Sequence, residues 1–183
     1  MDRALTLAIH HWFAPSPLGP FMAWITDPEN WYIPIGLLMA ALIAVSWRRG
    51  LAAIVIALAA VGVGDGMGHY LIKPLFARPR PCIALPDEIV PLVGCVDSYS
   101  FPSNHAINSM AAAVALGMFF PKLRWPLVGL AALVAVSRVV VGAHYVADVT
   151  AGALLGAFLG WGMARVARRF GAPFPQQVNA CPE

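Results

Sequence analysis

Long apolar runs without charged residues alternate with short polar segments along the 183 residues. With their polar ends included, five runs approach the roughly 20 residues that cross a bilayer as a helix: 30–47, 50–64, 106–120, 125–137 and 149–164. Only 11% of the residues are charged, whereas a soluble domain carries roughly 25%. An unusually apolar soluble protein is therefore excluded, and we predict an all-α integral membrane bundle with about five spanning helices.

The N-terminal segment differs from a spanning helix. Its apolar stretch at 4–9 is too short for a signal peptide, and His10 and His11 interrupt it. We expect a helix lying at the membrane interface, with its apolar side chains buried there. Those side chains are Leu5, Ile9, Trp12 and Phe13. The predicted organisation is a single domain, 1–183, with an interfacial segment, a bundle containing one outward loop, and a cytoplasmic tail: 1–29, 30–169 with 79–102, and 170–183.

The basic residues follow the positive-inside rule. They lie between the first two predicted spans, between the third and fourth, and after the fifth, without acidic neighbours. They are Arg48, Arg49, Lys122, Arg124, Arg165, Arg168 and Arg169. These regions alternate correctly to share the cytoplasmic side, so loop 79–102 and the end of the fourth span face outward. The net charge of +3 reflects this topology and predicts no binding of nucleic acid.

Two of the three cysteines, Cys82 and Cys95, fall in the outward loop. An oxidising compartment permits a disulfide there, which would close a long, proline-rich segment. Two free thiols are the alternative, because the sequence does not determine the distance between them. Cys181 falls on the predicted cytoplasmic tail, where we expect it to stay reduced.

Two clusters of polar residues flank the outward loop. The first is Lys73-Pro-Leu-Phe-Ala-Arg78-Pro-Arg80, at the end of the second span. Such cations often only reach toward headgroups, but their density on this side of the membrane indicates a rigid anion clamp. The second is Ser103-Asn104-His105, where Ser103 is a typical N-cap and the helix N-terminus suits a phosphate. A plain capping motif is the alternative.

A third cluster joins Arg138 to His144 and, one helical turn further, to Asp148. Ionisable groups at membrane depth are expensive and are usually retained for a function. Arginine can hold an anion, histidine can attack or move protons, and the carboxylate can orient the histidine. An Arg138–Asp148 pair tying two helices together is the alternative. Because the predicted topology places all three clusters on one side of the membrane, we favour a shared site.

In this order, Lys73-x6-Arg80-Pro81, Pro102-Ser103-x-His105 and Ser137-Arg138-x5-His144-x3-Asp148 resemble the three-part signature of the type 2 phosphatidic acid phosphatase superfamily, in its bacterial integral-membrane branch. The chain departs from that pattern at Asn104, where the family usually has glycine. Asparagine keeps the backbone amide that contacts phosphate in this family. Undecaprenyl-diphosphate phosphatases of the superfamily often carry aspartate there, so a polar residue favours that subgroup.

The resemblance implies a metal-independent lipid phosphatase without a cofactor, in the bacterial inner membrane, with its site facing the periplasm or exterior. It implies His144 as the nucleophile that forms a phosphohistidine, Asp148 as the group that orients it, and His105 as acid and then base. The implied phosphate-binding groups are Lys73, Arg80, Arg138, Ser103 and the Asn104 amide, with Arg78 contacting the headgroup or supporting a binding residue. The expected partners are a membrane lipid phosphate and the bilayer; no oligomeric state is predicted.

Two further polar residues, Asp65 and His69, precede Lys73 by eight and four positions. A regular helix would turn all three toward the bundle interior. They either orient Lys73 or make a polar contact between helices, and we favour the contact. A ladder of small residues on the fifth span predicts close helix packing: Gly152, Gly156 and Gly160.

Several functions remain in competition. Undecaprenyl diphosphate is the favoured substrate, with phosphatidylglycerol phosphate, phosphatidic acid and lipid A as alternatives. A lipid phosphotransferase could use the same phosphohistidine. An anion-binding or transport protein would need no nucleophile, and the inverted repeats of many transporters are not visible in the sequence. Vanadate-dependent haloperoxidases carry related motifs but are larger and soluble.

Overall fold

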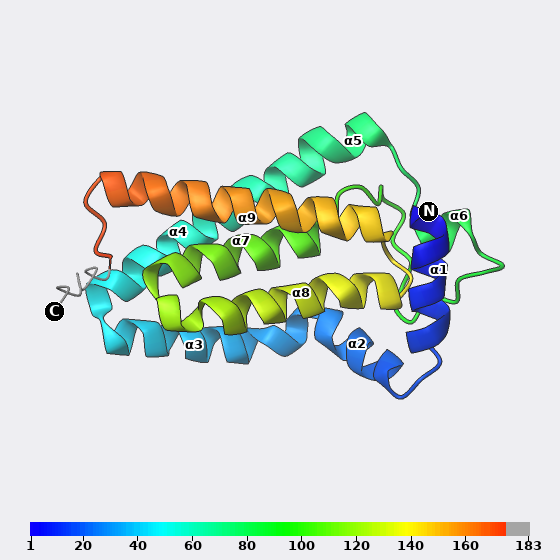
Figure 1. Ribbon diagram of the computed structural model, residues 1–183, viewed down its shortest axis with the longest axis horizontal. Coiled ribbons are helices and arrows are strands. Elements are labelled where there is room, and N and C mark those ends of the chain that lie inside the picture. The colour runs from blue at the N-terminus through cyan, green and yellow to red at the C-terminus, as the bar shows by residue number, and fades with distance from the viewer. Residues whose placement is uncertain (175–183) are drawn as a thin grey trace, which may run out of the picture.

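A bundle of long helices forms the body of the molecule (Figure 1). The computed structural model describes residues 1–174, and its long helices are α3 (Tyr32–Val45), α4 (Trp47–Gly66), α7 (Asn104–Phe119), α8 (Arg124–Val140) and α9 (Val146–Arg169). Each coincides closely with one of the five predicted runs. The all-α prediction is confirmed, because a chain in lipid must satisfy its backbone polar groups within each helix.

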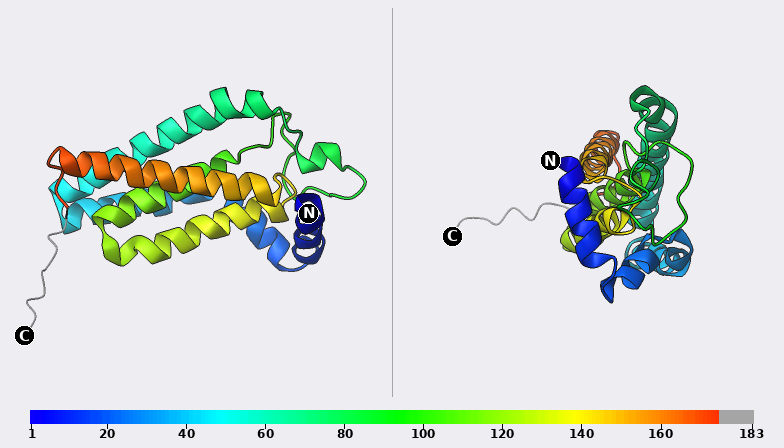
Figure 2. Two further views of the ribbon diagram at one scale, coloured as in Figure 1. Left: turned by 45° about the horizontal axis from the view of Figure 1, so that its top comes forward. Right: turned by 90° about the vertical axis from the view of Figure 1, so that its right-hand side faces the viewer.

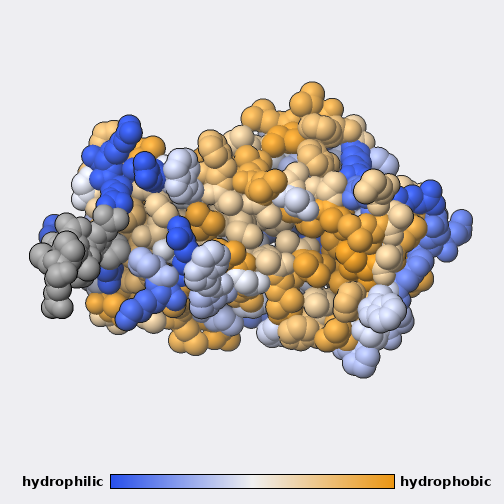
Figure 3. Space-filling view, in the orientation of Figure 1, coloured by the Kyte–Doolittle hydropathy of each residue, from blue (hydrophilic) through white to orange (hydrophobic). Residues whose placement is uncertain are grey.

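Four helical stretches are long and apolar enough to cross a bilayer: Pro28–Val45, Trp47–Ala84, Pro121–Val140 and Val146–Arg169. The remaining predicted span, α7, has 16 residues and runs through the centre, packed against α4, α8 and α9. Large apolar side chains such as Leu37, Val55 and Phe158 are exposed on the outside. On the face drawn in Figure 3, hydrophobic surface lies between two hydrophilic ends, as a bilayer requires.

The two ends of the bundle carry different connections (Figure 1). The α3–α4 turn, the α7–α8 turn and the end of α9 lie at one end, and these segments carry the basic residues on which the predicted topology rests. The opposite end holds α1 (Asp2–Phe13), α2 (Leu18–Thr26), α6 (Pro81–Ala84) and the α8–α9 turn. The alternation predicted from lysine and arginine is therefore present in the fold.

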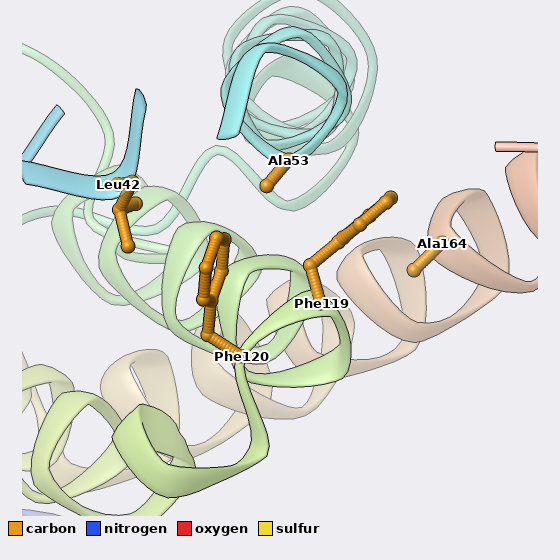
Figure 4. Packing of buried hydrophobic residues seen from close by; sticks show 5 residues of the cluster. All are labelled: Leu42, Ala53, Phe119, Phe120 and Ala164. Atoms are coloured by element: carbon orange, nitrogen blue, oxygen red, sulfur yellow. The ribbon is translucent and has the colours of Figure 1, made fainter. Parts of the chain in front are cut away.

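An apolar core closes the basic end of the bundle (Figure 4). It joins Leu42 of α3, Ala53 of α4, Phe119 and Phe120 at the end of α7, and Ala164 of α9. Phe119 is fully buried. A second apolar cluster joins α7, α8 and α9 toward the other end, through Ala106, Ala135, Val139 and Val149.

Helix α9 lies unusually close to α7 because glycines line the contact. A Cβ added at Gly152, Gly156 or Gly160 would strike α7 at the carbonyl oxygens of Ser103, Ile107 and Ala111, respectively. The predicted packing ladder is confirmed. Its outward rung at Gly152 brings the start of α7, with its serine and histidine, next to the start of α9.

The helix that carries Lys73 changes its winding before it reaches that residue. α4 continues into a π-helix, Met67–Ile72 (η2), and then into α5, Lys73–Phe76. The i→i+5 hydrogen bonds of a π-helix widen the turn, so a four-residue spacing no longer keeps side chains on one face. The prediction that Asp65, His69 and Lys73 all face the interior is confirmed only for Lys73, which is buried. His69 and Asp65 are exposed, although Asp65 contacts α7.

The predicted N-terminal helix is present as α1, and it lies across the end of the bundle (Figure 2). Its polar face packs on α8 and α9, which buries Thr6 and His10 and leaves Leu5 and Trp12 exposed. His10 Nδ1 lies 2.8 Å from the Val140 carbonyl oxygen. Amphipathicity alone indicated the helix, but it did not reveal this docking onto the protein.

A disulfide between Cys82 and Cys95 closes the outward loop, with the two Cα atoms 6.2 Å apart. Of the two alternatives for these cysteines, the structure adopts the paired one. The predicted tail from residue 175 onward, with Cys181, lies outside the described residues.

Replacing Gly156 by alanine is expected to lower the free energy of unfolding by about 1–3 kcal/mol, the usual cost of overpacking. The added Cβ would collide with the Ile107 carbonyl. Gly162 on the same helix has nothing within 4 Å of an added Cβ, so Gly162→Ala is the matched control. Thermal unfolding of the detergent-purified variants measures the difference, and equal melting temperatures would contradict the role of the ladder.

Candidate active site

The three predicted clusters meet at the end of the bundle that α1 covers. Six of their polar side chains are buried there, each with an exposed fraction of at most 8%: Lys73, Arg80, Ser103, Arg138, His144 and Asp148. His105 is half-buried in the first turn of α7. Burying polar groups costs free energy unless they find partners, so the contacts of each group indicate what the site is built to do.

Arg80 contacts the Nε2 edge of the His144 ring. Its Nη1 lies 3.1 Å from His144 Nε2 and donates to the Ala143 carbonyl at 3.3 Å. A guanidinium can only donate, so Nε2 acts as an acceptor and the ring proton is assigned to Nδ1. Nδ1 then faces Asp148 Oδ2 at 3.6 Å, which is longer than a hydrogen bond. In this tautomer Nε2 carries the lone pair of the ring.

Arg80 is itself held by Ser98. Its Nε donates to the Ser98 carbonyl oxygen at 3.1 Å and its Nη2 to Ser98 Oγ at 2.9 Å. Arg80 precedes Cys82 by two residues and Ser98 follows Cys95 by three. The disulfide therefore joins the two loop segments that make this contact. Sequence analysis missed Ser98, because a serine in an irregular loop belongs to no periodic pattern.

Asp148 is fully buried, and both of its carboxylate oxygens and its backbone carbonyl oxygen accept hydrogen bonds. Oδ2 accepts from Tyr145 N at 2.9 Å in a capping box, and Oδ1 accepts from Arg78 Nη1 at 2.7 Å. Its backbone carbonyl accepts from Ser103 N at 3.1 Å, which ties the second cluster to the third. The salt-bridge partner of Asp148 is therefore Arg78, and the alternative of an Arg138–Asp148 pair is not formed.

The three buried cations form no salt bridge with a carboxylate in residues 1–174. Arg138 Nη1 donates to Thr26 Oγ1 at 2.6 Å, a contact from α2 that sequence analysis missed, and its buried Nε has no partner. The charges of Lys73, Arg80 and Arg138 act on one another unfavourably. Unpaired buried charge is strongly destabilising, so this arrangement suits an anionic ligand.

Neutral donors add to the cations. The buried hydroxyls of Ser100 and Ser103 have no hydrogen-bond partner. The first intrahelical bond of α7 runs from Ile107 N to the Ser103 carbonyl, so the amides of 104–106 lack acceptors within the helix. Cations, hydroxyls and a helix N-terminus in one place are the groups with which proteins bind phosphate.

The side chain of Asn104 turns away from the cations. Its Nδ2 donates to Asp65 Oδ1 at 2.8 Å, and Asn108 Nδ2 donates to the same oxygen at 2.9 Å. Asp65 therefore joins α4 to α7, which is the polar helix contact that we favoured. A Cβ at Gly68 would lie 2.8 Å from Asn104 Oδ1, so the π-helix supplies the space for this side chain. The backbone amide of Asn104 remains at the start of α7.

Burial lowers the pKa of His144, which lies in the turn between two membrane-spanning segments. The Asp148 carboxylate opposes this shift, whereas the charges of Arg80 and Arg138 add to it. The imidazole is therefore neutral near pH 7, as a nucleophile must be.

The geometry defines a class of protein: a helical membrane protein with a buried cluster of cations and a histidine–aspartate pair at one end. Residues 49–172 match the PAP2 superfamily, and the chain belongs to that superfamily. It is a multi-pass membrane protein.

Curated relatives act on several lipid phosphates, as their names state. Undecaprenyl-diphosphatase BcrC of Bacillus subtilis is 31% identical over 100 residues, 55% of this chain and 51% of that protein. Lipid A 4'-phosphatase of Bacteroides thetaiotaomicron is 32% identical over 152 residues, 77% of this chain and 66% of that protein. The matches thus span between half and two thirds of these relatives' own lengths.

Two solved structures share the fold. The transmembrane PAP2-type phosphatidylglycerolphosphate phosphatase from Bacillus subtilis superposes with a TM-score of 0.69 at 24% identity, over 94% of this chain and 89% of that one. Aquifex aeolicus LpxE superposes with a TM-score of 0.66 at 22% identity, over 90% and 94%. The described helices therefore have the arrangement found in these two structures.

The lowered pKa of His144 makes folding stability depend on pH. Below the ordinary histidine value of 6.5, the unfolded chain binds a proton that the folded ring refuses, so stability falls as the pH drops toward the folded pKa. Acidification from pH 7.5 to 5 is expected to lower the melting temperature of the wild type more than that of His144→Gln. Parallel pH curves for the two proteins would show that His144 is not held neutral by the fold.

Proposed function

We propose that this protein is a membrane lipid phosphatase that hydrolyses a lipid phosphate or diphosphate, with undecaprenyl diphosphate as the favoured substrate. One observation carries the proposal. Three buried cations form no salt bridge with a carboxylate among the described residues, and one of them, Arg80, contacts Nε2 of a neutral histidine. A transferred phosphoryl group supplies the missing negative charge, and it develops its charge on oxygens that such donors stabilise.

The chemistry follows from the tautomer and the donors. When the Arg80 fork moves from the ring to the phosphate, the Nε2 lone pair of His144 is released and attacks phosphorus. The bond to the lipid oxygen, or in a diphosphate to the lipid-phosphate oxygen, breaks and a phosphohistidine forms. Asp148 stabilises the positive charge of the ring, and its 3.6 Å separation from Nδ1 closes when that charge develops. His105 protonates the departing oxygen and then takes a proton from the water that cleaves the phosphohistidine.

The remaining assignments place the phosphate oxygens against five groups, namely Lys73, Arg80, Arg138, Ser103 and the Asn104 amide. Lys73 contributes a point charge, while the two arginines contribute planar forks. The chemistry of these residues calls for no metal or cofactor. A step through phosphohistidine needs only the lipid phosphate and water as reactants.

The favoured substrate rests on two supports: the relative named undecaprenyl-diphosphatase, and the polar residue at Asn104. Phosphatidylglycerol phosphate, phosphatidic acid and lipid A phosphates are the alternatives, and relatives named lipid A phosphatases support the last. We place the site at the periplasmic or exterior face of the bacterial inner membrane, because the basic residues gather at the opposite end of the bundle.

Replacing His144 by alanine is expected to reduce phosphate release by at least about a thousandfold, because the nucleophile is removed. Purified protein is assayed with EDTA on undecaprenyl diphosphate, phosphatidylglycerol phosphate, phosphatidic acid and lipid A, and the order of kcat/KM identifies the substrate. His69→Ala is the matched control, since that histidine is exposed on the outside of η2. It should retain wild-type rates.

Three outcomes would contradict the proposal in different ways. A His144→Ala variant with wild-type rates would exclude a phosphohistidine intermediate on His144. Phosphate that appears on a second lipid instead of in solution would identify a phosphotransferase. A folded wild type that binds orthovanadate but releases no phosphate from any lipid would indicate an anion-binding or transport protein.

A further inference from the structure

We infer that α1 is a working part of the site, and that Asp2 and Arg78 are positioning residues that hold Asp148 in the orientation His144 needs. This inference rests on the proposed function and adds a role for two residues that are not among the defining positions of the three motifs. Asp2 belongs to the N-terminal helix, more than 140 positions from Asp148 in the sequence. Three observations carry the inference.

The first observation is the way Arg78 uses both arms of its fork. Nη1 donates to Asp148 Oδ1 at 2.7 Å, and Nη2 donates to Asp2 Oδ2 at 2.6 Å. The guanidinium carbon lies 3.7 Å from the centre of the Tyr145 ring. A planar guanidinium that is bound at two carboxylate oxygens and stacked against an aromatic ring has little conformational freedom. Arg78 thereby links a carboxylate of α1 rigidly to the fully buried carboxylate of α9.

The second observation is that α1 caps α9. Asp2 Oδ1 accepts from Ala147 N at 2.9 Å, and Thr6 Oγ1 accepts from Val146 N at 3.2 Å. The first N–H groups of a helix have no intrahelical partner and are usually satisfied by a neighbouring residue of the same segment. Here a distant helix satisfies two of them. Asp2 therefore anchors both the start of α9 and the side chain that holds Asp148.

The third observation is the division of the Asp148 carboxylate. Oδ1 is engaged by Arg78, which leaves Oδ2 on the side that faces His144 Nδ1. Without Arg78 the carboxylate keeps the hydrogen bond from Tyr145 N to Oδ2 at 2.9 Å, but it can tilt about that one contact, so the distance from Oδ2 to the His144 ring is no longer fixed. Neither Asp2 nor Arg78 belongs to the proposed phosphate-binding set. Their loss is therefore expected to slow the chemical step and to leave phosphate binding unchanged.

The test compares Asp2→Asn, Arg78→Gln and the double variant with the wild type, on the lipid that the wild type cleaves fastest. We expect kcat to fall about 10- to 100-fold for Arg78→Gln and about tenfold for Asp2→Asn, the usual range for residues that orient a catalytic group. KM and the inhibition constant for orthovanadate should stay within about twofold. Asparagine keeps an amide oxygen that can accept from Ala147 N, so Asp2→Asn weakens mainly the contact with Arg78. The double variant should therefore be no slower than Arg78→Gln alone.

Two controls separate positioning from a general loss of structure. Arg3 lies on the same helix, α1, and makes an exposed contact with Glu88 of the loop. Arg3→Gln breaks this contact and should keep the wild-type kcat. Asp2→Glu restores the carboxylate and should recover most of the rate that Asp2→Asn loses. Melting temperatures measured alongside identify any variant that is poorly folded. In that case the comparison of Asp2→Asn with Asp2→Glu tests the positioning role.

The outcomes distinguish the two claims. An active wild type whose Asp2→Asn and Arg78→Gln variants keep full kcat overturns the positioning role alone. A multiplicative loss in the double variant, or an equal loss in Arg3→Gln, also overturns it. A wild type that releases no phosphate from any lipid overturns the proposed function, and the positioning role falls with it.

Discussion

The structure depends on one electrostatic constraint: three cations are buried together at one end of a membrane bundle without a carboxylate of their own. Lys73, Arg80 and Arg138 come from three different segments and act on one another unfavourably. Such an arrangement is stable only because the surrounding fold is rigid enough to hold it. The same charge that makes the arrangement costly makes it a strong site for an anion.

The rigidity has identifiable sources outside the site. The glycine contacts set α7 directly against α9, and the disulfide loop clamps Arg80 through Ser98. The π-helix leaves room for Asn104 while it delivers Lys73 to the interior. From the outside, α1 caps α9 and holds Arg78. Each device fixes a backbone segment that carries one polar group, which is how a small bundle can afford so much buried charge.

Much of this could be predicted from the sequence, because bilayer thickness and the cost of buried charge are strong constraints. They predict the five helices, the shared end of the three clusters and the packing role of Gly156. Helical periodicity predicts that His69 faces the bundle interior, but the π-helix changes the winding there and the side chain is exposed. Periodicity could not find Asp2, Thr26 or Ser98, because their roles depend on contacts between segments far apart in the sequence.

The central claim is that His144 takes the phosphoryl group while the cations hold it. The most direct measurement is a rapid alkaline quench of the wild type during turnover of radiolabelled lipid phosphate, followed by mapping of the labelled peptide. Alkaline conditions are used because phosphohistidine is unstable in acid. The account predicts transient label on the peptide that contains His144. Steady phosphate release with label on another residue, or with no labelled protein at any time point, would contradict it.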